Sequence, residues 1–275
     1  MNTATHTIPS TVTSPDGTEI AYHTSGDGPP LLLVHGGGGD HTRWGALVAH
    51  LEPHVTVHAM DRRGHGASGD HPDYRLEREF EDVAAVIDAI AAASGSPVAV
   101  YGHSYGGICA FGATALASNI SRLALYEGWP PVDHGHFPPP AGHLQHVEAL
   151  LEAGDAEAAL QTVLRQVVGL TEEELRRYRE QPSWAARLRA VHHFRREERT
   201  FFDVRFDPQQ ASGITVPTML LTGGQSPDWG LEVADVAAAL PDARVSVLEG
   251  QGHGADIMVP EVVAERLLAF VADSP

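Results

Sequence analysis

The residue of this chain best suited to chemistry is a serine set among glycines. Ser104 lies in the pentapeptide GHSYG at positions 102–106, which fits the G-x-S-x-G pattern of a turn from a strand into a helix. Such a turn exposes the serine hydroxyl and strains its backbone, and small neighbours avoid the clashes that result. The apolar run 97–101 before it predicts a buried strand, and residues 106–111 predict a helix. Ser104 is therefore the candidate nucleophile.

An ordinary glycine-rich turn would show the same letters, so the assignment needs a base for the serine proton. A free hydroxyl is a poor nucleophile until such a base activates it. His253 is the best candidate, because it lies between two glycines on a loop after the strand predicted at residues 244–248. The alternative is a surface histidine on a loop without a role.

A second glycine run suits the stabilisation of negative charge. Four glycines at positions 36–39 follow the buried strand predicted at residues 31–34, so their backbone N–H groups can face an oxyanion. We expect the oxyanion donors to be the N–H groups of Gly37 and Tyr105, with Gly38 as the alternative to Gly37. A merely flexible loop is the other interpretation of this run.

The elements that must position these residues alternate between strands and helices. Two extended runs, residues 8–13 and 18–24, flank the turn sequence SPDG and predict an antiparallel hairpin at a sheet edge. Further strands are predicted at residues 55–59, 123–126, 216–221 and 244–248, and helices at residues 44–51, 80–93, 231–240 and 262–271. We therefore predict an α/β fold with a mostly parallel, doubly wound sheet.

The alternation stops between residues 129 and 213. This segment opens on proline runs and then predicts helix after helix, with Asp155 and Thr171 as N-caps and a capping box at residues 171–174. We predict a helical cap over residues 129–213, inserted into a core formed by residues 1–128 and 214–275. It would cover the strand ends, where open α/β sheets bind ligands.

Four motifs in this order resemble the α/β-hydrolase fold superfamily, from about Thr7 to Ala272. They are HGGGGD at 35–40, DRRGHGASG at 61–69, the pentapeptide at 102–106 and GQGH at 250–253. The resemblance implies a serine esterase or lactonase with a helical cap, a catalytic triad and no cofactor. Haloalkane dehalogenases and epoxide hydrolases of this superfamily carry Asp at the position of Ser104, so their chemistry is not implied.

The triad acid departs from the usual family pattern. That pattern places the acid after the strand that follows the cap, where this chain has Ser226, with Asp228 two residues later. Some members, including haloalkane dehalogenases and certain lactonases, place it after the strand before the cap, where this chain has Glu127. The resemblance favours Glu127, leaves Asp228 as the alternative, and leaves a third outcome in which neither serves. Without a catalytic role, Glu127 would pair with an arginine and Asp228 would cap a helix.

Composition restricts partners and cofactors. The chain has 275 residues and a net charge of −18, which argues against a nucleic-acid or anionic-membrane partner. All 18 basic residues are arginine, so lysine Schiff-base chemistry is excluded. The N-terminus lacks the features of a signal peptide and no apolar run approaches a membrane span, so we expect a cytoplasmic protein.

The 17 histidines raise the question of a metal site. HGH at 134–136 and the pair His143 and His146 offer ligands, but no cysteine accompanies them and the proline-rich surroundings suit a loop. We expect no metal ion and no cofactor.

The predicted cap is the expected source of specificity. We expect Trp129, Phe137 and Trp184 to contact a small-molecule substrate, an apolar ester or lactone that includes cyclic and aromatic types. Alternatives on the same triad are perhydrolase or haloperoxidase activity, C–C bond hydrolysis, and thioester or amide cleavage. A ligand-binding protein with little turnover is the alternative from another class, and a homodimer is left open.

Overall fold

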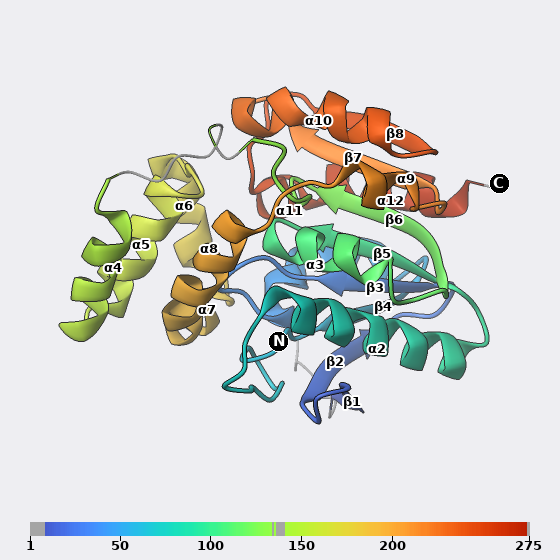
Figure 1. Cartoon of the computed structure of the whole chain (residues 1–275), viewed down its shortest axis with the longest axis horizontal. Coiled ribbons are helices and arrows are strands. Elements are labelled where there is room, and N and C mark those ends of the chain that lie inside the picture. The colour runs from blue at the N-terminus through green and yellow to red at the C-terminus, as the bar shows by residue number, and fades with distance from the viewer. Residues whose placement is uncertain (1–8, 134, 136–140, 274–275) are drawn as a thin grey trace.

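Eight strands form one sheet in the order β1-β2-β4-β3-β5-β6-β7-β8 (Figure 1). They belong to a computed structural model that describes residues 9–133, 135 and 141–273. The pairs β1–β2 and β2–β4 are antiparallel, and the remaining pairs are parallel. The strand bounds are β1 Ser10–Thr13, β2 Glu19–Ser25, β3 Pro30–Val34, β4 Thr56–Met60, β5 Val98–His103, β6 Ile120–Tyr126, β7 Thr218–Gly223 and β8 Ala243–Leu248.

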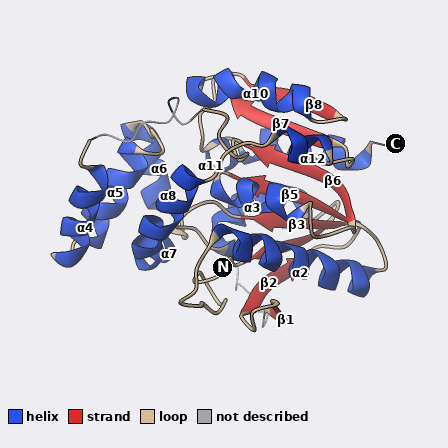
Figure 2. Ribbon diagram, in the orientation of Figure 1, coloured by secondary structure: helices blue, strands red, loops and turns tan. Residues whose placement is uncertain are grey.

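Helices cover both faces of this sheet, as Figure 2 shows. Leu32 and Val34 of β3 point into one apolar layer and Leu31 and Leu33 into the other, as expected for a strand buried on both sides. One layer contains α2 (Leu76–Ser94), α3 (Tyr105–Ala113), α9 (Pro208–Ser212) and α10 (Pro227–Ala239), and the other contains α1 (Gly45–Leu51), α11 (Ala255–Met258) and α12 (Pro260–Ala272). The predicted fold class is confirmed.

A group of helices between β6 and β7 packs around an apolar cluster of its own, beyond one end of the sheet (Figure 1). The group consists of α4 (His143–Glu152), α5 (Ala156–Gln166), α6 (Glu172–Glu180), α7 (Trp184–Ala190) and α8 (Phe194–Asp203). The side chain of Asp155 caps α5, and Thr171 with Glu174 forms the capping box of α6. No strand occurs in the described part of residues 129–213.

Three local features differ from the sequence-based expectation. α9 lies inside residues 129–213 but packs with α10 in the core layer, because its buried Ala211 faces that layer. α10 begins at Pro227 rather than at residue 231, so Asp228 lies in its first turn. The short helix α11, just after His253, was not predicted. No described helix combines the length and the apolar composition needed to cross a bilayer.

Candidate active site

The turn from β5 into α3 holds Ser104 in a backbone conformation that non-glycine residues rarely adopt. Its φ is 54° and its ψ is −131°, and its N–H donates to the carbonyl oxygen of Tyr126 at 2.9 Å. The neighbouring Gly106 has no room for a Cβ, which would collide with the carbonyl oxygens of Val34 and His35. The glycine therefore lets α3 approach β3 closely, and the turn holds Ser104 at the carboxyl end of β5.

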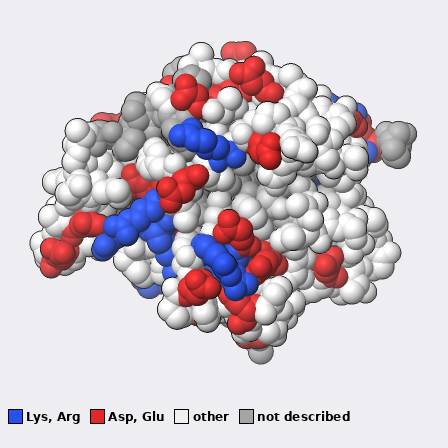
Figure 3. Space-filling model, viewed as in Figure 1, with Lys and Arg blue, Asp and Glu red and all other residues white. Residues whose placement is uncertain are grey.

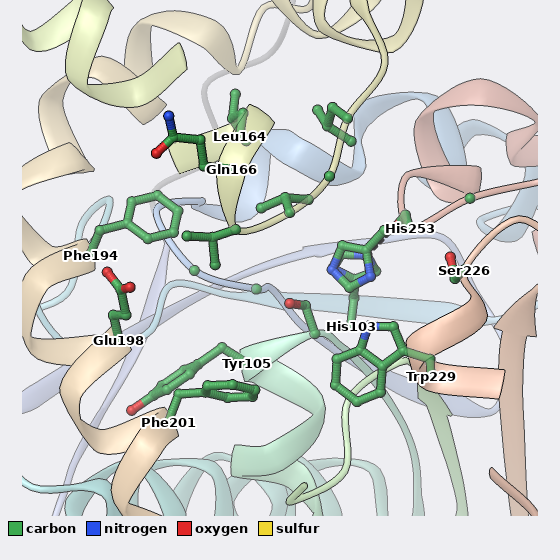
Figure 4. Close-up of a pocket in the computed structure, with 18 of the residues that line it drawn as sticks. His103, Tyr105, Leu164, Gln166, Phe194, Glu198, Phe201, Ser226, Trp229 and His253 are labelled. Carbon is green, nitrogen blue, oxygen red and sulfur yellow. Dashed lines mark hydrogen bonds between the residues drawn. The ribbon is translucent and has the colours of Figure 1, made fainter. Parts of the chain in front are cut away.

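Ser104 and His253 line a cavity of about 440 Å³ between the sheet and the cap helices. In Figure 4, His253 and Trp229 lie on one side of this cavity, and Phe194, Glu198 and Phe201 lie on the other. The apolar lining residues are Ile108, Leu164, Val167, Val168, Leu170, Phe194, Phe201, Phe202 and Trp229. The site is thus a mostly apolar pocket with a few polar groups, which is the common form of a small-molecule site.

Glu127 orients the imidazole of His253. The carboxylate is fully buried at the end of β6, and its Oε2 lies 2.6 Å from Nδ1 of His253. Its Oε1 accepts hydrogen bonds from the N–H of Gly223 at 2.7 Å and the hydroxyl of Thr222 at 3.2 Å. Because Nδ1 donates to the carboxylate, Nε2 of the neutral ring is left as an acceptor for a hydroxyl proton.

Asp228 also lines the cavity, but it does not contact the imidazole. It is exposed in the first turn of α10, and Ser226 is the N-cap residue of that helix. Among the described residues, the carboxylate in contact with His253 is that of Glu127. The structure therefore brings Glu127 rather than Asp228 to the histidine.

The glycine loop after β3 lies beside the elbow, with Gly36 and Gly37 in the cavity wall. Gly38 cannot serve as an oxyanion donor in this arrangement, because its N–H donates to Oε2 of Glu197 at 3.2 Å. Within the described part of the chain, the N–H groups of Gly37 and Tyr105 have no acceptor. Tyr105 is the first residue of α3, so the positive end of the helix dipole adds to its donor strength.

A buried carboxylate that sequence reasoning missed joins the cap to this loop. Glu197 of α8 forms an ion pair with Arg62 and accepts from Nε2 of His65 at 3.0 Å, besides holding Gly38. Burial alone would raise the pKa of Glu197, but the charges of Arg62 and His65 lower it to about 2. The charged carboxylate therefore fixes α8 against the oxyanion loop.

Two buried arginines, Arg43 and Arg187, also line the cavity and were not singled out from the sequence. Nη2 of Arg43 donates to Oδ1 of Asp256 at 2.6 Å and lies 3.2 Å from Nε2 of His103. Burial and the charge of Arg43 hold the pKa of His103 well below its usual value, so that ring is neutral. The one sequence signal for Arg187 is its place among the buried positions of α7, beside Ala186 and Ala190.

The aromatic residues expected to contact substrate lie elsewhere or are not described. Trp129 is fully buried in the core layer, with its ring edge-on to that of Trp229 at a centroid distance of 5.2 Å. Trp184 packs on the apolar cluster of the cap. Neither side chain lines the cavity, so the expectation that Trp129 and Trp184 contact the substrate is corrected. Trp229 lines the cavity instead. Phe137 lies outside the described residues, as do His134 and His136.

One cluster in the described chain has the composition of a metal site. Ligand atoms of His23, His41 and Asp61 lie within 4.8 Å of one another. However, the carboxylate of Asp61 already accepts from the N–H and Nδ1 of His41 at 2.7 and 2.8 Å and from the N–H of Ala67 at 2.9 Å. Nδ1 of His143, from the pair considered above, lies 2.9 Å from Oε1 of Gln166. These hydrogen bonds give Asp61, His41 and His143 structural roles in the described chain.

The comparisons with known proteins agree with this architecture. An alpha/beta hydrolase from Sphaerobacter thermophilus is similar in structure with a TM-score of 0.80 at 34% identity, covering 96% of this chain and 100% of its own. The enol-lactonase from Burkholderia xenovorans shares the fold, with a TM-score of 0.73 at 21% identity over 96% of this chain and 100% of its own.

The sequence is also similar to a hydrolase of known substrate. It is 25% identical to the (E)-2-((N-methylformamido)methylene)succinate hydrolase of Acinetobacter baylyi. The 259 aligned residues cover 92% of this chain and 94% of the relative. A family model described as "Alpha/beta hydrolase family" matches residues 31–266. With the elbow, the sheet order and these likenesses in agreement, the chain belongs to the alpha/beta hydrolase family.

Proposed function

We propose that this chain is a cofactor-free serine hydrolase that cleaves a carboxylic ester or lactone through an acyl-enzyme on Ser104. The observation that carries the proposal is the 2.6 Å contact between Nδ1 of His253 and the buried carboxylate of Glu127. That contact fixes the tautomer in which Nε2 of His253 can take the proton of a hydroxyl in the same cavity.

In this mechanism the hydroxyl oxygen of Ser104 attacks the carbonyl carbon of the substrate while Nε2 of His253 accepts its proton. The N–H groups of Gly37 and Tyr105 donate to the oxyanion of the tetrahedral intermediate. His253 then protonates the leaving alkoxide, and in the second half it activates a water that hydrolyses the acyl-enzyme. In a lactone the leaving alkoxide stays attached to the acyl group, so both halves act on one molecule.

Glu127 has two roles in these steps. It holds the imidazole of His253 in one orientation, and its charge stabilises the imidazolium that forms during each proton transfer. The hydrogen bonds from Gly223 and Thr222 hold the carboxylate in place. Replacement of the acid of such a triad by an amide typically lowers kcat by about 10²–10⁴-fold.

The cavity supports an apolar substrate of modest size. Its volume of about 440 Å³ and its aliphatic and aromatic walls suit a short acyl or alcohol group. An esterase from Thermogutta terrifontis and the enol-lactonase share the fold, and the succinate-derivative hydrolase is similar in sequence. These names support hydrolysis as the reaction class and guide the choice of esters for a screen.

Burst kinetics with a chromogenic short-chain ester test the proposal. We expect a burst of about one equivalent of alcohol per chain, followed by slower turnover, and we expect Ser104→Ala to remove both. Ser226→Ala is the matched control, since this serine also lines the cavity, and it should keep the burst. Ester turnover that survives Ser104→Ala would refute the mechanism, and ligand binding without any turnover would favour the binding-protein alternative.

A further inference from the structure

Arg187 of α7 is a buried cation in the cavity wall, and no carboxylate of the described residues forms an ion pair with it. It is 3% exposed, and its Nε and Nη2 atoms have no hydrogen-bond partner among the described residues. Its guanidinium lies over the ring of Tyr178, with Cζ 5.0 Å from the ring centroid. A buried charge without a partner is costly, so natural proteins rarely keep one without a use.

The carboxylates near this cation are hydrogen-bonded to other groups. Arg43 lies in the same cluster, and the nearby carboxylate, Asp256, gives its Oδ1 to Arg43 at 2.6 Å. Burial and the charge of Arg43 lower the pKa of Arg187 to about 10, so it stays charged at neutral pH. The charges of Asp256 and Asp40 act on Arg187 in the opposite direction. However, Oδ1 of Asp256 accepts from Arg43, and Oδ1 of Asp40 accepts from the N–H and hydroxyl of Thr42. Neither carboxylate forms an ion pair with Arg187 in the described structure.

Three other carboxylates along the cavity are engaged elsewhere, and the exposed Asp228 forms no ion pair with Arg187 in the described structure. Glu197 is paired with Arg62, and Glu174 accepts from the backbone and hydroxyl of Thr171 at 2.8 Å. Glu198 faces His143, with 3.7 Å between Oε2 and Nε2. None of them forms an ion pair with Arg187 in the described structure, so the guanidinium can pair with an anion that a ligand brings into the cavity.

We propose that Arg187 binds a carboxylate of the substrate, so that the natural substrate is an otherwise apolar ester or lactone that carries one carboxylate. A planar guanidinium suits a carboxylate because its N–H groups match the two oxygens. The Tyr178 ring lies against the guanidinium, whose buried Nε and Nη2 have no hydrogen-bond partner among the described residues, so a carboxylate that reached them would satisfy both. The inference rests on the proposed function and revises the expectation of an uncharged substrate.

The test compares half-esters with neutral diesters. The probes are the monoethyl and diethyl esters of succinate, glutarate and adipate, with acid release followed by titration. We expect the native chain to prefer a half-ester, mainly through a lower KM. Arg187→Gln should lower kcat/KM for that half-ester by roughly 30- to 5000-fold, the range for loss of one member of a buried charge pair, and far less for the diester.

Two further variants separate recognition from a general change of charge. Arg187→Lys keeps the charge but loses the planar donor pair, so it should restore only part of the half-ester preference. Arg189→Gln removes an exposed arginine of the same helix and should keep the preference. Equal losses on both ester types in Arg187→Gln, together with a lower melting temperature, would show a structural role and overturn the proposal.

A binding measurement tests the inference without turnover. Calorimetric titration of Ser104→Ala with monoethyl glutarate should show binding that Arg187→Gln removes in the double variant, and diethyl glutarate should bind more weakly. If the native chain hydrolyses diesters through Ser104 but shows no preference for half-esters, this inference fails and the proposed function stands. If the carboxylate binds but Ser104→Ala leaves ester turnover intact, the proposed function fails alone.

Discussion

Two strained residues meet where the chemistry is proposed. Ser104 and Glu127 are the non-glycine residues with positive φ in the described chain, at 54° and 44°. They follow adjacent parallel strands, β5 and β6, and the N–H of Ser104 donates to Tyr126, the residue before Glu127. Such strain persists only where the surrounding structure fixes it, and it is often found at functional sites.

Glu127→Gln tests the acid at the residue scale. We expect it to lower kcat by about 10²–10⁴-fold with the fold intact, because an amide neither fixes the imidazole tautomer nor stabilises its positive charge. Asp228→Asn is the matched control, since that exposed side chain does not contact His253, and it should cost far less. If Asp228→Asn lowered kcat far more than Glu127→Gln, at matched stability, Asp228 would be the triad acid.

Ser104 and His253 could be proposed from the sequence because each lies in a local glycine motif, whereas the family resemblance favoured Glu127 over Asp228. Arg187 and Glu197 could not be proposed, because a charged residue on an amphipathic helix looks the same whether it faces solvent or a partner far away in sequence. Glu197 meets Arg62 and Gly38 across more than a hundred residues of chain. Only the packing of α8 on the core reveals these contacts.

At the scale of elements, α8 holds the cap to the core through one buried carboxylate. Glu197→Gln removes the charge that compensates Arg62 and His65, so we expect a loss of about 3–5 kcal/mol in unfolding free energy at pH 7. The measurement is urea unfolding of the native chain and the variant. Glu148→Gln, which removes a surface pair with Arg195, is the control and should cost less than about 1 kcal/mol.

The difference in unfolding free energy between the native chain and Glu197→Gln should depend on pH. The pKa of Glu197 is about 2 in the folded chain, below the value of about 4.3 for an unfolded glutamate. Its contribution is therefore fully present above about pH 4.3 and is lost as the pH falls toward 2. The stability gap between native chain and variant should be constant from pH 7 to 5 and should shrink at pH 3. A gap independent of pH would contradict this assignment.

The cap helices also supply the apolar wall. Phe201 of α8 lines the cavity, whereas Trp184 of α7 packs inside the cap. Phe201→Ala should therefore change the relative kcat/KM of bulky and small esters by about tenfold, the scale of removing part of a hydrophobic contact. Trp184→Ala should lower the melting temperature more and change the preference less. If Trp184→Ala changed the ester preference more than Phe201→Ala, α7 rather than α8 would supply the apolar wall that contacts the substrate.

Aromatic composition alone could not make this distinction. Trp129, Trp184 and Trp229 are all large apolar residues near the cap in sequence, yet they lie in the core layer, in the cap cluster and in the cavity wall, respectively. The helical periodicity predicted the cap helices, because amphipathic patterns report local structure. It did not predict the short helices α9 and α11, whose four or five residues are too few to show a period.

At the scale of the whole molecule, the fold follows from patterns that the sequence carries openly. Apolar runs such as residues 31–34 and 98–101 predict strands buried on both faces, and the structure pairs β3 with β5 at the centre of the sheet. The edge hairpin was readable from its turn sequence. The strand order and the contacts between cap and core depend on pairings between distant residues, so the local patterns did not predict them.

The surface charge fits a protein that acts on small molecules. The net charge is −18, and in Figure 3 the arginines on the visible face lie beside acidic side chains. Exposed ion pairs in the described chain include Arg176 with Glu173 and Arg165 with Glu172. The positive charge with a proposed role is the buried Arg187, inside the cavity.

The most direct test of the account is covalent labelling of the intact chain with a fluorophosphonate. This reagent reacts with serines that an adjacent base activates, so the mass of the whole chain should increase by one label. Peptide mapping should place the label on Ser104, and Ser104→Ala should remain unlabelled. A label on any other residue, or none on a folded native sample, would contradict the account.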